Sequence, residues 1–472
     1  MRLLADARQM AMTARKGKNT PACPPATFYM VGLGCPKNRV DSDQLWAELA
    51  MRGIVPVGDP ADAELIVINT CAFVGEAVGE SLEVIEEHAR YKTEGSCRTL
   101  AVCGCLPARF GKTSDRRRIA EEVDLWIGPE PASRVADRLI GTRAGREHRF
   151  SGDPPARVNS LSAGAAYLKV ADGCSRRCSF CLIPRLRGPL RSRPAAELVQ
   201  EAEQLAAMGV KELVLVAQDL ASWGQDLPGR PGLWQLVDGL ARVDGIRWIR
   251  MMYLFPKRPP LRLLGLFERH PNVLPYFDVP LQHADSRVLR RMRRGGGPAV
   301  YEGFIDAIRQ RVPGAVIRTT FMVGFPGEDD RAFDNLLRFV RKARFERMGA
   351  FVFSPEPGTE AASMQKGVPP QVAKKRLDRL MKLQRTIAES YHRAIVGRRL
   401  EVLVEGRAGG GMSVGRAWNQ APEVDGETVI KGRAKVGEII EARVTGFGPY
   451  HLEVEPVESP PRSRRRTAPE ER

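Results

Sequence analysis

Short apolar runs that alternate with helix-like stretches constrain the fold of this chain more than any other feature. Between residues 27 and 140, the runs FYMVGL, LIVIN and TLAVC have the length and composition of buried strands. Helices are predicted between them, over 41–52 with Gly53 as a stop signal and over 75–90. Because strand–helix–strand alternation favours parallel pairing, we predict a flavodoxin-like α/β domain at residues 27–145.

The alternation restarts after SGDPPARVNSLSAGA (151–165), whose Gly, Pro and Ser content is typical of a linker. Six further strands are predicted near residues 166–170, 212–216, 246–252, 275–279, 316–323 and 348–353. Helices are predicted between them, for example over 195–208 and 330–343. Six βα units within residues 160–392 favour a partial (β/α)6 barrel, with its active site at the carboxyl ends of the strands.

The last part of the chain changes pattern. A long helix is predicted over 371–396, and LEVLVEG, SVGRAW, ETVIKG, EIIEARV and HLEVEP then alternate apolar and polar residues between glycines. This pattern is typical of a small five-stranded barrel of the OB type, which we place at residues 395–457. Residues 1–26 and 458–472 are expected to be disordered, since neither segment can form an apolar core.

Composition narrows the classes of function. The chain has 472 residues, nine of them cysteine and six histidine, and no run of about 18 apolar residues that would cross a membrane. A cytoplasmic protein is therefore expected, in which thiols stay reduced and serve metal binding or catalysis. The scarcity of histidine favours all-thiolate ligation of zinc or iron–sulfur clusters. The net charge of +17 is consistent with a nucleic-acid or ribosomal partner, and equally with solubility alone.

Three cysteines each follow one of the first predicted strands: Cys35, Cys71 and Cys105. The carboxyl ends of parallel strands line the functional crevice of an open sheet, so three loops that are distant in sequence can bring these thiols together. The alternative is that they are buried apolar cysteines that happen to follow strands.

Three more cysteines lie within GCSRRCSFC, at positions 174, 178 and 181. A zinc site lacks its fourth ligand here, because histidine is absent from residues 149–269. Three thiolates instead suit a four-iron cluster with one open iron. An open iron can bind S-adenosylmethionine, whose reductive cleavage gives a carbon-centred radical. Arg176 and Arg177 either offset the charge of such a cluster or are simply solvent-exposed.

The stretch YLKVADGCSRRCSFCLIPRLRGPLRSR resembles the signature of radical S-adenosylmethionine enzymes, and more narrowly of the methylthiotransferases. The resemblance covers almost the whole chain: a methylthiotransferase N-terminal domain, a radical core and a C-terminal TRAM domain. It implies two [4Fe-4S] clusters, one on Cys174, Cys178 and Cys181 and an auxiliary one on the first trio. It also implies two S-adenosylmethionine molecules per turnover.

Five motifs, GCPKN, NTCAF, FDVPLQHAD, RTTFMVGFPGE and FSPEPGT, resemble the protein-modifying branch of that family. This branch adds a methylthio group to the β-carbon of an aspartate in small-subunit ribosomal protein twelve, either free or within the ribosome. It implies a low-potential electron donor, a sulfur source and a monomeric enzyme. The alternatives are a transfer-RNA adenosine methylthiotransferase and a non-enzymatic zinc or RNA-binding protein.

Other positions carry weaker predictions. Polar residues at the ends of later predicted strands are candidates for binding S-adenosylmethionine: Gln218, Asp219, Gln282, His283, Arg318 and Thr320. Cys103 is assigned to a strand interior, and Cys23 and Cys97 to no role. Acidic residues of the C-terminal barrel, Glu423, Asp425 and Glu427, either face a basic ribosomal partner or form a solvated loop.

Overall fold

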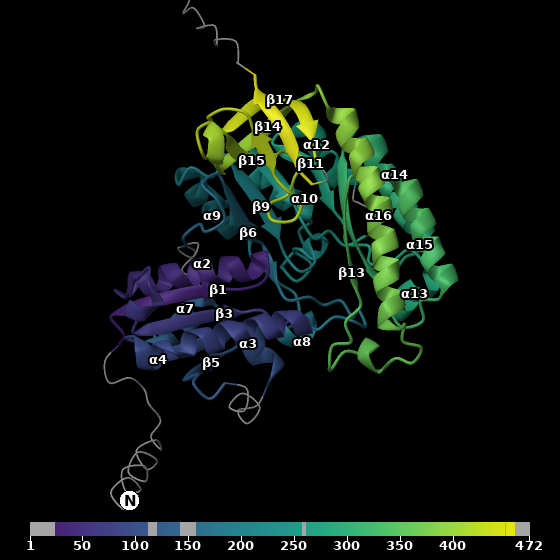
Figure 1. Ribbon diagram of the computed structural model, residues 1–472. Coiled ribbons are helices and arrows are strands. Elements are labelled where there is room, and N and C mark those ends of the chain that lie inside the picture. The colour runs from purple at the N-terminus through teal and green to yellow at the C-terminus, as the bar shows by residue number, and fades with distance from the viewer. Residues whose placement is uncertain (1–23, 112–119, 142–156, 257–260, 449, 458–472) are drawn as a thin grey trace, which may run out of the picture. The chain divides into compact units, whose positions relative to one another are not determined.

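The computed structural model describes residues 24–111, 120–141, 157–256, 261–448 and 450–457 (Figure 1). Cys23 and nearly all of the two end segments predicted to be disordered lie outside these ranges. The chain divides into two compact units, one built mainly from residues before 159 and the other mainly from residues 159–472.

The first unit is a five-stranded parallel sheet. Its strands are β1 (Thr27–Gly32), β2 (Val55–Pro56), β3 (Leu65–Thr70), β4 (Thr99–Gly104) and β5 (Leu125–Ile127). The strand order β2-β1-β3-β4-β5, with every neighbouring pair parallel, is the flavodoxin-like order. The predicted fold class of this region is therefore confirmed.

Helices cover both faces of this sheet. They are α2 (Pro36–Met51), α3 (Gly75–Ala89), α4 (Tyr91–Glu94), α5 (Cys105–Arg109) and α7 (Ala132–Leu139), with a 3-10 turn η1 (Pro60–Asp62). α2 packs against α7, and α3 lies across the sheet from α2 in Figure 1. The prediction that the first helix begins near residue 41 is wrong: it begins at Pro36, because proline needs no hydrogen-bond acceptor in a first helical turn.

The second unit contains a six-stranded parallel sheet. Its strands, in spatial order, are β13 (Arg347–Val352), β12 (Val316–Val323), β11 (Val273–Asp278), β10 (Trp248–Met251), β9 (Glu212–Val216) and β6 (Ala165–Lys169). A short hairpin pairs β7 (Ala171–Asp172) with β8 (Arg191–Ser192). The order follows the sequence without closing, which confirms the predicted partial barrel.

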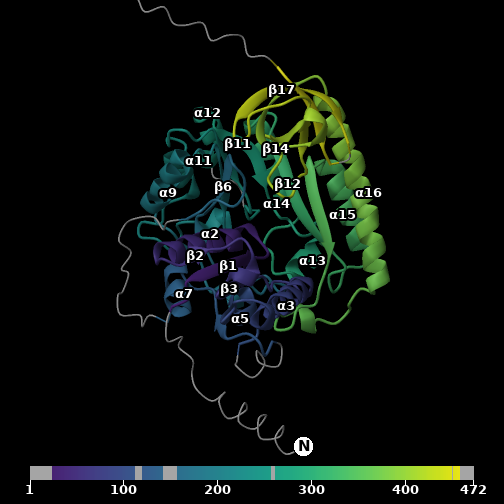
Figure 2. The ribbon, with the colours of Figure 1, turned by 60° about the vertical axis from the view of Figure 1, so that its left-hand side comes forward.

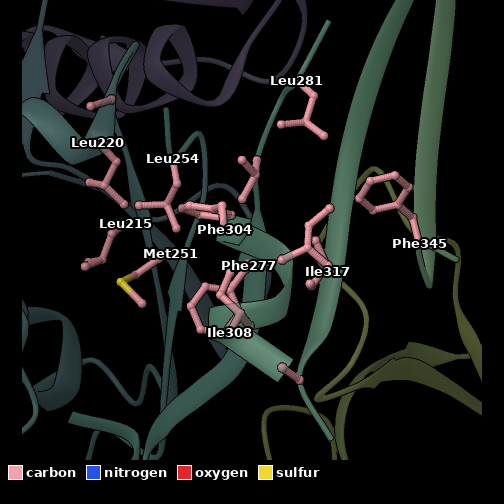
Figure 3. Packing of buried hydrophobic residues seen from close by; sticks show 14 of the residues in the cluster. Leu215, Leu220, Met251, Leu254, Phe277, Leu281, Phe304, Ile308, Ile317 and Phe345 are labelled. Carbon is pink, nitrogen blue, oxygen red and sulfur yellow. The ribbon is translucent and has the colours of Figure 1, made fainter. Parts of the chain in front are cut away.

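The helices of this unit pack outside the sheet. They are α8 (Ile183–Arg187), α9 (Ala195–Ala207), α10 (Leu233–Leu240), α11 (Leu261–Leu264), α12 (Leu266–Arg269), α13 (Ser286–Arg291), α14 (Pro298–Arg311), α15 (Asp330–Ala343) and α16 (Pro370–Ile395), with 3-10 turns η2 (Leu220–Ser222) and η3 (Ala361–Ser363). α15 and α16 run beside β12 and β13 (Figure 2). Figure 3 shows Met251, Phe277 and Ile317 of three adjacent strands next to Phe304 and Ile308 of α14. This apolar packing holds the strands in place, and with them the loops at their carboxyl ends.

The C-terminal region is a closed five-stranded barrel, as predicted. Its strands are β14 (Arg399–Arg407), β15 (Ser413–Ala417), β16 (Thr428–Ile430), β17 (Ile439–Phe447) and β18 (Leu452–Pro456), with a 3-10 turn η4 (Gly409–Gly411). Gly415 is required for closure, since a Cβ there would lie 2.0 Å from the carbonyl oxygen of Leu403. Within the ranges that the structure describes, no helix combines the length and apolar content needed to cross a membrane.

Candidate functional site

The first cysteine trio lies at the carboxyl edge of the five-stranded sheet. Cys35 caps the amino end of α2 after β1, Cys71 follows β3 directly, and Cys105 follows β4 and opens α5. β1 and β3 are the neighbouring strands at which the strand order reverses. In open parallel sheets such a switch point is where ligands bind, so the topology supports the position predicted for this trio.

The loops that carry the trio touch one another. Gly34, next to Cys35, has a φ of +89°, and a Cβ on it would lie 2.4 Å from the Cβ of Cys71. The Thr70 hydroxyl donates to the carbonyl oxygen of Cys103 at 2.6 Å and accepts from the backbone N–H of Leu106 at 3.3 Å. The first contact joins the loop of Cys35 to Cys71, and the Thr70 bonds tie the segments that carry Cys71 and Cys105.

Asn38 is a positioning residue that the sequence did not reveal. Its side-chain amide is buried and donates to the carbonyl oxygens of Leu33, Asn69 and Thr70, at 2.6, 3.3 and 3.3 Å. One side chain thus ties the loop after β1 to the end of β3. Asn38 is the last residue of the GCPKN motif, and it can join these segments only because β1 and β3 pair in the fold.

The second trio lies in the loop that follows β6 and β7. Gly173 fixes the start of this loop: its φ is +70°, and a Cβ on it would lie 2.1 Å from the carbonyl oxygen of Pro189. Two sulfurs accept a backbone hydrogen bond, Cys174 from the N–H of Arg176 and Cys181 from the N–H of Ile183, each at 3.4 Å. Backbone donors of this kind stabilise a thiolate.

Burial works against ionisation of these thiols. It raises the pKa of Cys174, and it raises the pKa of Cys181 to about 12, with the neighbouring thiols of Cys178 and Cys174 adding to the effect. Both groups are therefore neutral thiols near pH 7, and binding a metal centre would release their protons.

A polar cavity of about 310 Å³ lies against Cys174. Its other lining residues are Ser175, Arg176, Leu190, Asp219, Ser222, Gln225 and Asp226. The Asp219 Oδ2 accepts from Arg176 at 2.7 Å and from the Ser222 hydroxyl at 2.7 Å. Its Oδ1 is buried with no hydrogen-bond partner in the described part of the chain. One carboxylate oxygen is therefore available to a ligand.

The two predicted glutamines, Gln218 and Gln282, each have a side-chain oxygen without a hydrogen-bond partner among the described residues. The Gln218 amide nitrogen donates to Asp172 at 3.1 Å, while its Oε1 is buried without a partner among the described residues. Gln282 has a φ of +71°, and its Oε1 is likewise buried and unpartnered within the described ranges. An unpaired buried oxygen is costly unless a ligand satisfies it, which makes both side chains candidates for binding.

His283 makes one hydrogen bond inside the fold, and its Nε2 has none among the described residues. The side chain is fully buried, its Nδ1 accepts from the backbone N–H of Asp285 at 2.9 Å, and its Nε2 lies 3.3 Å from a carboxylate oxygen of Glu328. The ring therefore braces the turn that follows β11.

Arg318 and Thr320 are not where the sequence placed them. β12 continues to Val323, so both residues lie inside the strand and not at its carboxyl end. Arg318 pairs with Asp278 at 2.9 Å and with Asp425 of the C-terminal barrel at 3.3 Å. Burial opposes its charge, but these carboxylates raise the pKa of Arg318 above its ordinary value. The prediction that the two residues stand at a strand end is wrong.

The acidic residues of the C-terminal barrel also have internal partners. Asp425 is buried and accepts from the hydroxyl of Tyr276 and, at 2.9 Å, from the N–H of Ala421. Glu423 accepts from the Tyr167 hydroxyl at 2.8 Å. The prediction that these carboxylates face a basic partner is therefore wrong for Asp425, which is buried. Glu423 and Glu427 are both exposed, and for these two residues it stays a prediction.

Two cysteines outside the two trios, Cys97 and Cys103, are buried. Cys103 lies inside β4, as predicted, and Cys97 is also buried, which raises the pKa of its thiol. Arg294 and Phe255, in contrast, lie beside the second trio and were not predicted. The Arg294 Nη1 is 3.9 Å from the sulfur of Cys178, and its guanidinium lies over the Phe255 ring. Arg294 follows Cys178 by 116 residues, so no local pattern connects them.

Comparison with known proteins agrees with this arrangement. Residues 168–340 match the Radical SAM superfamily, residues 27–128 match the uncharacterized protein family UPF0004, and residues 396–457 match the TRAM domain. The solved radical S-adenosylmethionine methyltransferase TsrM from Kitasatospora setae has a TM-score of 0.54 at 12% identity, over 77% of this chain and 89% of its own. At that identity the likeness concerns the fold alone.

Relatives of higher identity span nearly the full length. The ribosomal protein uS12 methylthiotransferase RimO of Anaeromyxobacter sp. (strain K) is 46% identical, over 90% of this chain and 92% of its own. The protein of the same name from Myxococcus xanthus (strain DK1622) is 42% identical over 94% of each chain. This chain belongs to the family of ribosomal protein uS12 methylthiotransferases.

Proposed function

We propose that this protein is a radical S-adenosylmethionine enzyme that adds a methylthio group to the β-carbon of an aspartate in ribosomal protein uS12. The observation that carries the proposal is the presence of two thiol trios, each at the carboxyl end of a parallel sheet in its own unit. One trio suits radical generation, and a second is what insertion of sulfur requires in addition. The relatives named above support the same activity.

The residues present fit two [4Fe-4S] clusters. Thiolates are the usual protein ligands of such clusters, and each trio supplies three of them: Cys174, Cys178 and Cys181 in one loop, and Cys35, Cys71 and Cys105 at three strand ends. Among the described residues, no three His, Cys, Asp or Glu side chains are already arranged around one metal ion. When bound, the clusters and S-adenosylmethionine supply the radical, the sulfur and the methyl group of the reaction.

The side chains of this protein would bind and orient S-adenosylmethionine. We assign S-adenosylmethionine to the cavity beside Cys174, where Asp219 Oδ1 can accept a hydrogen bond from the ligand. Gln218 and Gln282 offer the other unpartnered oxygens. His283 and Arg318 hold the strands that carry these groups through the contacts described above. The carbonyl oxygen of Thr320 accepts from the backbone N–H of Gln282 at 2.8 Å.

The proposal includes partners that the fold does not identify. An external low-potential donor would supply electrons, and a sulfur source would replenish the auxiliary site. Nine cysteines and a ribosomal substrate favour the cytoplasm, where thiols stay reduced. We propose that the enzyme acts as a monomer.

Two cysteine variants separate the roles of the trios. Cys178→Ala is expected to abolish formation of 5′-deoxyadenosine, whereas Cys71→Ala should retain it and lose methylthio transfer to a uS12 peptide. Both products are measured by mass spectrometry on anaerobically reconstituted enzyme, with Cys97→Ala as a matched control of a buried cysteine outside both trios. Identical losses in the two variants would contradict this division of roles.

A deletion strain tests the substrate. Its uS12 should lack the mass gain of one SCH2 unit, which the wild-type gene should restore, while its transfer-RNA methylthiolation stays unchanged. The reverse result would favour the transfer-RNA branch. Metal analysis that finds zinc without iron in the anaerobically purified protein would exclude both enzymatic alternatives.

A further inference from the structure

The three sulfurs of the second trio do not have equivalent surroundings. Cys174 and Cys181 each accept from a backbone N–H, but Cys178 faces a side chain, the Arg294 guanidinium, whose Nη1 lies 3.9 Å from its sulfur. This is the one donor of the three that carries a full positive charge, and it comes from the segment between α13 and α14.

Arg294 is held in place on several sides. Only 8% of the residue is exposed, its Nη2 donates to the carbonyl oxygen of Pro280, and its guanidinium carbon lies 4.5 Å from the centre of the Phe255 ring. The contact with the aromatic face and the hydrogen bond to the carbonyl oxygen do not neutralise the guanidinium, but they restrict its orientation. The side chain is therefore fixed with one edge toward Cys178.

The charge of Arg294 is also uncompensated. Arg176 lies over the same Phe255 ring, at 3.7 Å, but its charge is balanced by Asp219 at 2.7 Å. In the ranges that the structure describes, Arg294 forms no ion pair with a carboxylate, and its Nε has no hydrogen-bond partner. A buried cation without a counter-ion acts strongly on any negative group that comes close.

We propose that Arg294 is a positioning residue that raises the reduction potential of the cluster held by Cys178. The inference rests on the function proposed above. Reduction by one electron makes a thiolate-ligated cluster more negative, and a fixed cation beside one ligand stabilises the reduced form more than the oxidised form. The two loop arginines are placed differently from Arg294: Arg176 pairs with Asp219, and Arg177 is exposed.

The test is a potentiometric titration followed by electron paramagnetic resonance. The full-length chain carries alanine at the auxiliary trio, Cys35, Cys71 and Cys105, so that one cluster is observed, and S-adenosylmethionine is omitted. Each reduction takes one electron from the chemical reductant. Arg294→Gln is expected to shift the reduced-to-oxidised ratio about tenfold toward the oxidised form, which corresponds to a midpoint about 59 mV more negative.

Three variants make the test specific. Arg294→Lys keeps the charge and should recover most of the shift, and Phe255→Leu should give a smaller shift in the same direction. Arg177→Gln removes a charge next to Cys178 in sequence and should leave the midpoint unchanged. A purely structural role would lower the iron content without moving the midpoint of the remaining clusters.

Two results would overturn the inference. One is an Arg294→Gln protein with normal iron content and the parent midpoint; the other is an equal shift in Arg177→Gln. If the parent protein held a reducible cluster and only the shift were missing, the inference alone would fail. If the parent held no iron–sulfur cluster, the proposed function would fail with it.

Discussion

The two ends of the six-stranded sheet are built on opposite principles. At the carboxyl end, polar atoms are left without partners among the described residues, including Asp219 Oδ1 and Gln282 Oε1. Toward the amino end, the carboxylates are paired with arginines and with residues of the C-terminal barrel. Two nitrogens of the Arg250 guanidinium also lack a partner among the described residues, so the contrast concerns the acceptor oxygens. Free acceptor oxygens at the carboxyl end suit a ligand, whereas the paired carboxylates toward the amino end serve stability.

The amino end is closed by a buried charge network. Glu212, the first residue of β9, accepts from Arg250 at 2.7 Å and from Arg416 of the C-terminal barrel at 2.6 Å, and all three side chains are buried. Arg416 also pairs with Glu405 at 2.9 Å. Burial alone would raise the pKa of Glu212, but the two arginines keep it below its ordinary value. Buried ion pairs thus join the barrel to the six-stranded sheet, and separating them would cost free energy.

The difference indicates where substitutions affect activity and where they affect stability. At the carboxyl end, a change should abolish activity with little effect on folding. Toward the amino end, the same kind of change should weaken folding with little effect on the iron content of the folded protein.

The largest expected effect is a loss of activity at the carboxyl end. Cys181→Ala should reduce 5′-deoxyadenosine formation below detection, because one cluster ligand is missing. The free energy of unfolding of the iron-free protein should change by less than about 1.5 kcal/mol, since a single sulfur atom is removed from a partly buried side chain in a loop. Product analysis and urea denaturation measure the two effects, and a large loss of stability would break the comparison.

The largest expected effect on stability lies at the amino end. Glu212→Gln leaves two buried guanidinium groups short of a counter-charge and should lower the free energy of unfolding by about 3–5 kcal/mol. Urea denaturation followed by tryptophan fluorescence measures it. The double variant Glu212→Leu with Arg250→Met should recover a large part of the loss, because Arg416 keeps Glu405. Additive losses in the double variant would show that the charges are not coupled.

The same residue gives a pH dependence with a defined sign. Because the folded pKa of Glu212 lies below that of an unfolded glutamate, its contribution is complete above about pH 4.3 and is lost as the pH falls through the lower, folded value. The unfolding free energy of the wild-type protein should therefore decline more steeply in acid than that of Glu212→Gln. Parallel curves for the two proteins would exclude Glu212 as the source.

A smaller loss is expected where the barrel meets β11. Asp425→Asn weakens the bonds from Tyr276 and Arg318 and should cost about 1–3 kcal/mol of unfolding free energy. Glu427→Gln, two residues away and exposed, is the matched control, with an expected change within about 0.5 kcal/mol. Equal effects of the two variants would contradict the buried role of Asp425.

The smallest effect on unfolding free energy is expected for an exposed ion pair between the C-terminal barrel and the segment before β10. Arg247 lies 2.9 Å from Glu401, with both side chains about half exposed. Arg247→Gln should change the unfolding free energy by about 0–1 kcal/mol, since water screens such pairs. Loss of the Trp248 bond to Glu401 in a Glu401→Leu variant should cost more, because that indole is buried.

Local sequence patterns predicted most of the fold. The strands at 212–216 and 316–323 and the helix at 330–343 occur with the predicted bounds, because their apolar spacing and the flanking glycines and aspartates act locally. The first helix was predicted to begin too late because Asp41 and Ser42 resemble an N-cap, whereas both lie inside the helix that begins at Pro36.

In the candidate site, too, the residues in local patterns were predicted, and those that depend on distant contacts were not. The nine residues of GCSRRCSFC and the three strand-end cysteines were found from the sequence, because the chemistry of thiols and the alternation of strands and helices are both written locally. Arg318 was taken as a strand-end residue although the predicted strand already placed it near the beginning, and the sequence does not show that Asp278 and Asp425 reach it.

The sequence by itself determined the fold class, the two thiol trios and the family resemblance. Only the tertiary structure decided which charged side chains form internal ion pairs and which have no counter-ion among the described residues. Arg176 and Arg294 are both arginines near the same loop, but Asp219 neutralises one of them and the other faces Cys178 alone. The physical reason is that the energy of a charge depends on its distance to partners and on its burial, and both are set by residues far apart in the chain.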